Sequence, residues 1–205
     1  MKPSNKYKLL YFFFLFYLLL LAQSSFSADD SLRFDAKIVN KQLAGISKQR
    51  SAQKAISPRN GTYLLIFLDI ECPICQKYTL KIRTLDSICK KNEINLVGIF
   101  TDRGAKKELI FQFKQKYNLQ IATLIDKKLK LAKALRASTT PEVFLINSRI
   151  GSIAYRGLID DWFYMLGKSR KEPTVHYLLD AIDSFQKKQE ISIKKTTPIG
   201  CLIQY

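Results

Sequence analysis

One short segment constrains this chain of 205 residues more than any other. A continuous apolar run at 63–68 is typical of a strand buried on both faces, and Cys72-Pro73-Ile74-Cys75 follows four residues later. Because proline favours the first position of a helix, the junction predicts a helix that begins at Pro73 with Cys72 as its N-cap. The free backbone N–H groups and the dipole of such a helix stabilise a thiolate, which is the nucleophilic form of cysteine.

The surroundings of this cysteine pair favour redox chemistry over the other uses of a Cys-x-x-Cys motif. Structural zinc needs four ligands, but the sequence has no second such motif and a single histidine, His176. Attached c-type haem requires a histidine after the second cysteine, where this chain has Gln76. A purely structural disulfide would close a ring too small to stabilise the chain much. We therefore predict that Cys72 exchanges with a disulfide and that Cys75 resolves the mixed disulfide.

The two remaining cysteines are separated from the pair. Cys89 continues an apolar stripe that begins at Ile74 with spacings of three and four residues, so we expect it in the core. A continuous helix places it about 21 Å from Cys75, which is beyond disulfide reach. Three options stay open for Cys201: a bond to Cys89, an approach to Cys72 as an additional resolving thiol, or a free thiol.

Strand and helix patterns alternate along the rest of the chain. Further strands are predicted at 95–100, 121–125, 142–147 and 150–155, the last two as an antiparallel hairpin, and further helices at 105–117, 127–137 and 173–188. This order predicts an α/β fold in which helices flank a central mixed β-sheet on both faces. We divide the chain into a signal peptide (1–27), a polar lead-in (28–60), one domain (61–190) and a C-terminal tail (191–205).

The N-terminus has the pattern of a secretory signal. Three lysines precede a fourteen-residue apolar run at 9–22, and small residues follow it. At about 1.5 Å per residue the run spans about 21 Å, less than the roughly 30 Å hydrocarbon core of a bilayer. We therefore expect cleavage near Ser24 or Ser27, no stable membrane span afterwards, and a periplasmic or secreted protein.

The chain is strongly basic, with a formal net charge of +17. Removal of the signal takes away three lysines and leaves +14. No nucleic-acid-binding motif accompanies this excess, and the chain is expected to leave the cytoplasm. We therefore expect no nucleic acid partner.

The sequence resembles the thioredoxin-like superfamily. The resemblance rests on the strand–Cys-Pro-x-Cys–helix pattern and on Thr140-Pro141, which matches the loop where that superfamily places a cis-proline against its cysteine pair. The segments at 131–135, 155–161 and 172–176 and the terminal Gly200-Cys201 are similar to the exported redoxin branch. That branch is grouped with the alkyl hydroperoxide reductase and thiol-specific antioxidant proteins.

This resemblance implies a thioredoxin fold and thiol–disulfide exchange with protein substrates. It implies that Thr140 and Pro141 position the partner chain, because exposed backbone beside the thiols can pair with an extended segment. It also implies a redox partner protein and neither a bound cofactor nor a metal. The direction of the redox reaction and the physiological substrate stay open.

The sequence departs from the superfamily at several positions. Asp69 stands where peroxiredoxins carry threonine, and Ile66 replaces the buried acid of thioredoxins. Asp69 and Glu71 should raise the pKa of the cysteine thiols, whereas Lys77 and the helix N-terminus should lower it, so its direction stays open.

Two alternative functions use some of the same residues. The first is a peroxiredoxin-like thiol peroxidase that uses Cys72, with Cys75 or Cys201 as the resolving thiol. The second is a copper-binding chaperone that uses Cys72, Cys75 and His176.

Overall fold

The computed structural model describes residues 32–47, 61–101 and 104–205. The predicted signal peptide at 1–27 lies outside these residues, as does most of the predicted lead-in. Among the helices of the described ranges, none is both long enough and apolar enough to cross a membrane.

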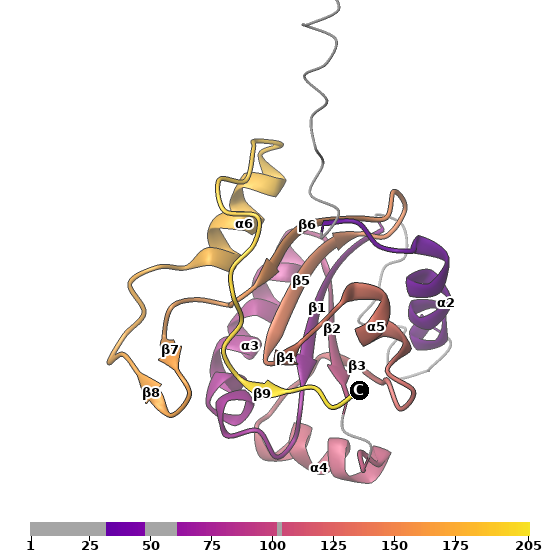
Figure 1. Ribbon diagram of the computed structural model, residues 1–205, viewed down its shortest axis with the longest axis vertical. Helices are drawn as coiled ribbons and strands as arrows, with labels where there is room; N and C mark the ends of the chain where they lie inside the picture. Colours follow the sequence, from indigo (N-terminus) through magenta and orange to yellow (C-terminus); the bar gives the residue numbers. More distant parts are fainter. Residues whose placement is uncertain (1–31, 48–60, 102–103) are drawn as a thin grey trace, which may run out of the picture. The chain divides into compact units, whose positions relative to one another are not determined.

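Five strands form the central sheet in the order β3-β2-β1-β5-β6 (Figure 1). They are β1 (Thr62–Leu68), β2 (Asn95–Phe100), β3 (Ala122–Ile125), β5 (Glu142–Asn147) and β6 (Ser152–Gly157). The sheet is mixed, as predicted, because β1 pairs in parallel with β2 and antiparallel with β5. Every residue of β1 and β2 is buried, which explains their continuous apolar sequences.

Helices cover both faces of the sheet, as predicted. The even-numbered apolar side chains of β1 pack into one core layer with α3 (Pro73–Lys91), α4 (Lys107–Lys116) and α6 (Tyr177–Gln186). The odd-numbered side chains pack into a second layer with α2 (Ala36–Ser47) and α5 (Lys130–Leu135). The alternation of side chains along a strand thus divides the hydrophobic core between the two faces.

Three helices are shorter than the sequence pattern predicts, although α4 lacks only three residues of the predicted 105–117. The helix predicted at 127–137 is confined to α5, because Leu129 and Arg136 adopt left-handed φ angles of 52° and 53° at its ends. The helix predicted from Pro173 begins four residues later, at the start of α6. The Asp161 carboxylate accepts the backbone N–H groups of Thr174 and Val175 and holds them in a turn.

Two elements are absent from the predicted set, in addition to two strands of two residues each at 139–140 and 201–202. Helix α2 lies within the segment predicted as a polar lead-in, yet its Val39, Leu43 and Ile46 are buried in the second core layer. The short hairpin of β7 (Phe163–Met165) and β8 (Lys168–Ser169) is the other missed element. Val39, Leu43 and Ile46 recur at the helical spacings of four and three residues, so α2 had a detectable pattern, whereas β7 and β8 are too short to show one.

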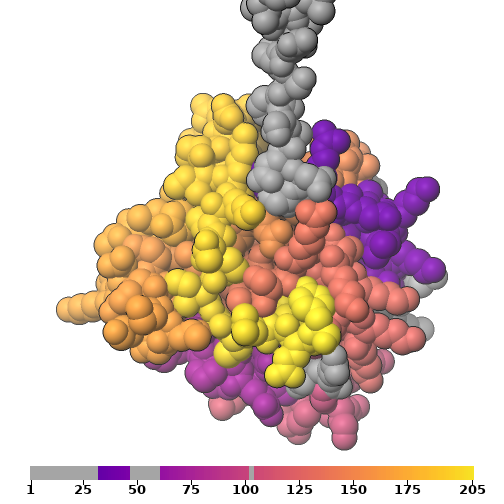
Figure 2. Space-filling model, viewed as in Figure 1, coloured from indigo at the N-terminus to yellow at the C-terminus, as the bar shows by residue number. Residues whose placement is uncertain are grey.

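The tail at 191–205 belongs to the same compact unit as the sheet, which runs from Ser31 to Tyr205. Its strand β9 (Cys201–Leu202) pairs antiparallel with the short strand β4 (Thr139–Thr140) (Figure 1). Figure 2 shows the tail as a yellow band that runs from the region of α6 across this face. The tail therefore brings Cys201 to the loop that precedes β5.

Candidate active site

Cys72 occupies the junction between β1 and α3, as the sequence predicts. It is the N-cap of α3, with extended backbone angles (φ −70°, ψ 115°), and Pro73 takes the first helical position. A turn precedes it, in which the Asp69 carboxylate accepts the N–H of Glu71 at 2.8 Å. The Cys72 sulfur therefore lies at the positive end of a 19-residue helix.

Cys75 follows one helical turn later on the buried face of α3. Its side chain is completely buried, and Cys72 is only 2% exposed. The predicted apolar stripe is confirmed, because Ile74, Tyr78 and the residues that continue it to Cys89 are all buried. Cys89 is thus a core residue, as expected, and lies at the far end of the helix from the pair.

The predicted proline loop lies directly beside Cys72. The Thr140–Pro141 peptide bond is cis. In its protonated form the Cys72 thiol donates a hydrogen bond to the Thr140 carbonyl, with a sulfur–oxygen distance of 3.2 Å. The structure thus brings Cys72, Cys75 and the Thr140-Pro141 loop together, although 68 positions separate Cys72 from Thr140 in the sequence.

A buried ion pair holds this loop in place, and the sequence analysis did not identify it. Glu142, which is fully buried, accepts hydrogen bonds from the backbone N–H of Ser138 and from the Arg156 guanidinium, both at 2.7 Å. Arg156 also donates to the carbonyls of Leu135 and Arg136. The available signal was a charged residue within each of two otherwise mainly apolar strands, β5 and β6.

Cys201 completes the group of sulfurs. Of the three options that the sequence left open, the structure shows the approach to Cys72. Cys201 is paired with Thr140 across the β4–β9 ladder, and its Sγ lies 2.8 Å from the Sγ of Cys72. Cys201 is half-buried, so it is the most exposed of the three sulfur-bearing residues. None of the four cysteines takes part in a disulfide.

The three neighbouring thiols have sharply different acidities. A hydrogen bond from Cys75, with a smaller contribution from Cys201, outweighs burial and lowers the pKa of Cys72 to about 4. Burial first, and then the Cys72 sulfur, raise the pKa of Cys75 well above 9 and that of Cys201 to about 12. Cys72 therefore holds the negative charge, and the other two thiols donate hydrogen bonds to it.

This arrangement predicts the pH dependence of Cys72 ionisation. Because its pKa is lowered, Cys72 should stay a thiolate from neutral pH down to about pH 4 and become protonated only below that value. The measurement is the ultraviolet absorbance of the thiolate as a function of pH, with the absorbance of reduced Cys72→Ser subtracted from that of the reduced wild type. A midpoint near 9, the ordinary value for cysteine, would contradict the hydrogen-bond arrangement described above.

His176 lies apart from the cysteines. It is exposed at the N-cap of α6 and lines a small cavity with Lys81 and Asp160. In the described ranges, no group of three His, Cys, Asp or Glu side chains is arranged to hold a metal ion. The geometry therefore does not support the copper site considered from the sequence.

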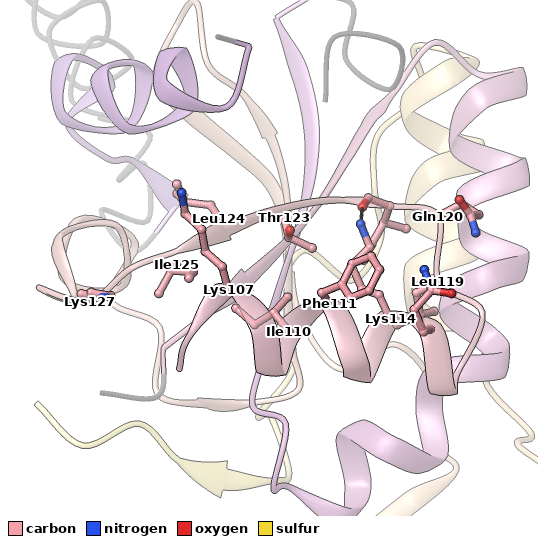
Figure 3. Close-up of a pocket in the computed structure, with 12 residues that line it drawn as sticks. Lys107, Ile110, Phe111, Lys114, Leu119, Gln120, Thr123, Leu124, Ile125 and Lys127 are labelled. Carbon is pink, nitrogen blue, oxygen red and sulfur yellow. Dashed lines mark hydrogen bonds between the residues drawn. The ribbon is translucent and has the colours of Figure 1, made fainter. Parts of the chain in front are cut away.

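A larger groove lies elsewhere in the fold. It has a volume of about 780 Å³ and runs between α4 and the edge strand β3 (Figure 3). Apolar side chains such as Ile110 and Leu124 line it together with Lys107, Lys114 and Lys127. Since no cysteine lines this groove, it is separate from the candidate active site.

Comparison with known proteins decides the family. Residues 35–156, more than half of the chain, match the AhpC/TSA family. The chain belongs to the AhpC/TSA family. This finding confirms the predicted redoxin resemblance and places the protein in a thioredoxin-like redox family. No curated protein matches the sequence.

Solved structures share the fold of this AhpC/TSA member. An uncharacterized conserved protein from Geobacillus kaustophilus is 19% identical with a TM-score of 0.61, covering 71% of this chain and 78% of its own. A hypothetical protein from Sinorhizobium meliloti is 20% identical with a TM-score of 0.62, covering 80% of this chain and 84% of its own. At these identities the likeness shows the fold, and the predicted fold class is confirmed.

Proposed function

We propose that this AhpC/TSA member is a thiol–disulfide oxidoreductase in which Cys72 is the nucleophile and Cys75 the resolving thiol. One observation carries the proposal: the Cys72 sulfur lies at the N-terminus of α3, 3.2 Å from the Thr140 carbonyl beside cis-Pro141. The lowered pKa of Cys72 beside two protonated thiols supports the assignment of the nucleophile.

The reaction divides between the two cysteines of α3. The Cys72 thiolate attacks one sulfur of a substrate disulfide, forms a mixed disulfide and releases the other substrate sulfur as a thiolate. Cys75 then attacks the Cys72 sulfur, so that the Cys72–Cys75 disulfide forms and the second substrate thiol leaves. A redox partner protein reduces this disulfide by the same two exchanges in reverse.

The change in charge on Cys72 favours the second step. While Cys72 is a thiolate, its negative charge and its hydrogen bond both raise the pKa of Cys75. Once Cys72 is bonded to the substrate, both effects disappear, although the burial of Cys75 remains. Cys75 therefore becomes a better nucleophile only after the mixed disulfide has formed.

The partners and location that we propose follow from the surroundings of the pair and from the N-terminal pattern. The substrate is a protein thiol or disulfide whose extended segment lies along Thr140 and Pro141, and the electrons come from a partner protein without a bound organic cofactor. The lysine-flanked apolar run at 9–22 supports an exported protein that acts in the periplasm or outside the cell.

Reduction of insulin disulfides by dithiothreitol tests the proposal. The signal-free wild type should accelerate the reaction, and Cys89→Ser should match it, because Cys89 lies in the core away from the pair. No acceleration over dithiothreitol alone would overturn the proposal. Rapid turnover of hydrogen peroxide without insulin reduction would instead favour the peroxidase alternative.

A further inference from the structure

The edge of β4 beside the cysteine pair is already occupied by the chain itself. Strand β9 pairs antiparallel with β4, with Thr139 opposite Leu202 and Thr140 opposite Cys201. The pairing continues beyond the strand, because the N–H of Ile203 donates to the Ser138 carbonyl at 2.9 Å. The tail thus takes the position that an extended substrate segment would need in order to pair with the Thr140 loop, so an external segment has to displace the tail or react with it.

Gly200 adapts the tail to this position. A Cβ atom at Gly200 would lie 2.1 Å from the Thr140 carbonyl oxygen, a backbone atom that cannot rotate away. A side chain here would therefore push the tail off the loop. A second contact holds the tail upstream, where the Thr196 hydroxyl accepts the N–H of Leu158 at 2.8 Å.

This docking places a thiol against the nucleophile. The sulfurs of Cys201 and Cys72 are 2.8 Å apart, so only a short movement separates them from the bond length of about 2.05 Å in a disulfide. Cys72 and Cys75 are buried, whereas Cys201 is partly exposed. Of the three neighbouring cysteines, Cys201 is therefore the residue that solvent reaches most.

We propose that Cys201 is a third redox-active cysteine that forms an intrachain disulfide with Cys72, so that the tail acts as an internal substrate strand of the Cys72–Cys75 pair. The proposal rests on the proposed function and extends it. It assigns a chemical role to the contact between β4 and β9. It also identifies Cys201 as the sulfur through which the buried pair exchanges disulfides with an external thiol.

The exchange conserves atoms and electrons. Cys201 gives up its proton and attacks the Cys72 sulfur of the Cys72–Cys75 disulfide. The Cys72–Cys201 bond forms as the Cys72–Cys75 bond breaks. Cys75 leaves as a thiolate and takes up a proton. An external protein thiolate then attacks Cys201 and forms a mixed disulfide with it. Cys72 is the leaving group, and its low pKa favours attack at Cys201.

Oxidation of Cys75→Ser by oxidised glutathione tests the proposal. Glutathione should first form a mixed disulfide with Cys201 or Cys72, and the other of these two sulfurs should then displace the bound glutathione. Tryptic mapping without reductant should find residues 60–77 linked to residues 196–205 within a monomer. Glutathione retained on Cys72 beside an unmodified Cys201, or a bond between two chains, would overturn the proposal.

A matched pair of glycine variants tests the role of the docked tail. In the Cys75→Ser background, Gly200→Ala should slow formation of the Cys72–Cys201 bond at least tenfold, because its Cβ collides with Thr140. Gly45→Ala is the control, since no atom lies within 4 Å of its Cβ position. Equal rates in the two variants would contradict the role assigned to the docked tail.

The two proposals fail in different ways. Disulfide mapping of Cys75→Ser requires no turnover, so it reports on Cys201 even if the wild type does not reduce insulin. Conversely, Cys201→Ser could reduce insulin at the wild-type rate while Cys75→Ser retains glutathione. These two results would exclude the role of Cys201 and leave the proposed function of the Cys72–Cys75 pair unaffected.

Discussion

Replacement of Cys72 by serine is expected to lower insulin reduction about 100-fold or more, to the rate of dithiothreitol alone. Cys72 is the thiol whose pKa is lowered, while burial and the Cys72 sulfur keep Cys75 and Cys201 protonated. A serine hydroxyl keeps the approximate size of the thiol but supplies no nucleophile at neutral pH. The measurement is the initial rate of insulin precipitation at a fixed concentration of dithiothreitol.

Two further variants make this result specific to the first chemical step. Cys75→Ser should still allow Cys72 to attack a substrate disulfide, because the nucleophile is intact. Cys89→Ser should keep full activity. Substantial insulin reduction by Cys72→Ser would contradict the assignment of the nucleophile and would point to Cys75 or Cys201 instead.

Replacement of Arg156 by alanine is expected to lower the free energy of unfolding by about 3–5 kcal/mol. Arg156 is paired at 2.7 Å with Glu142, and their side chains are only 9% and 0% exposed. Without the guanidinium, the Glu142 carboxylate would be left buried without its ion-pair partner, and the carbonyls of Leu135 and Arg136 would lose a donor. Urea unfolding at neutral pH measures the change.

A surface ion pair provides the control for this prediction. Lys187 pairs with Asp183 at 2.7 Å, and the two side chains are 58% and 62% exposed, so Lys187→Ala should cost less than about 1 kcal/mol from the ion pair. The double variant Glu142→Gln/Arg156→Met should recover part of the stability lost in Arg156→Ala, because it leaves no charge unpaired. Equal losses in Arg156→Ala and Lys187→Ala would show that the buried pair contributes no more to stability than a surface pair.

The predicted fold is most accurate where the determining interactions are local. Strand β1, the N-cap at Cys72 and the start of α3 follow from one apolar run and one proline, and the structure confirms all three. Helix α2 was missed, although Val39, Leu43 and Ile46 recur at helical spacings, because the polar residues among them suggested a lead-in. That this stripe is buried becomes evident only once the sheet surface that it covers is known.

The candidate site divides in the same way. Cys72, Cys75 and the Thr140-Pro141 loop were named from motifs, because the spacing of the cysteines and the order of strand and helix carry the information. The Glu142–Arg156 pair was not identified, since each residue alone resembles an ordinary surface charge. Because both residues are buried in neighbouring strands, each charge needs the other as its ion-pair partner.

The sequence by itself determined the fold class, the redox motif and the expected position of Cys89, because each depends on residues close together along the chain. Only the tertiary structure decided which thiol is acidic and where Cys201 lies. The position of Cys201 depends on a contact between sulfurs 129 positions apart, which forms when β9 pairs with β4. That contact adds to the hydrogen bond from Cys75, which is the main cause of the lowered pKa of Cys72. No local pattern encodes such a contact, since it requires the sheet, the loop and the tail to be in place together.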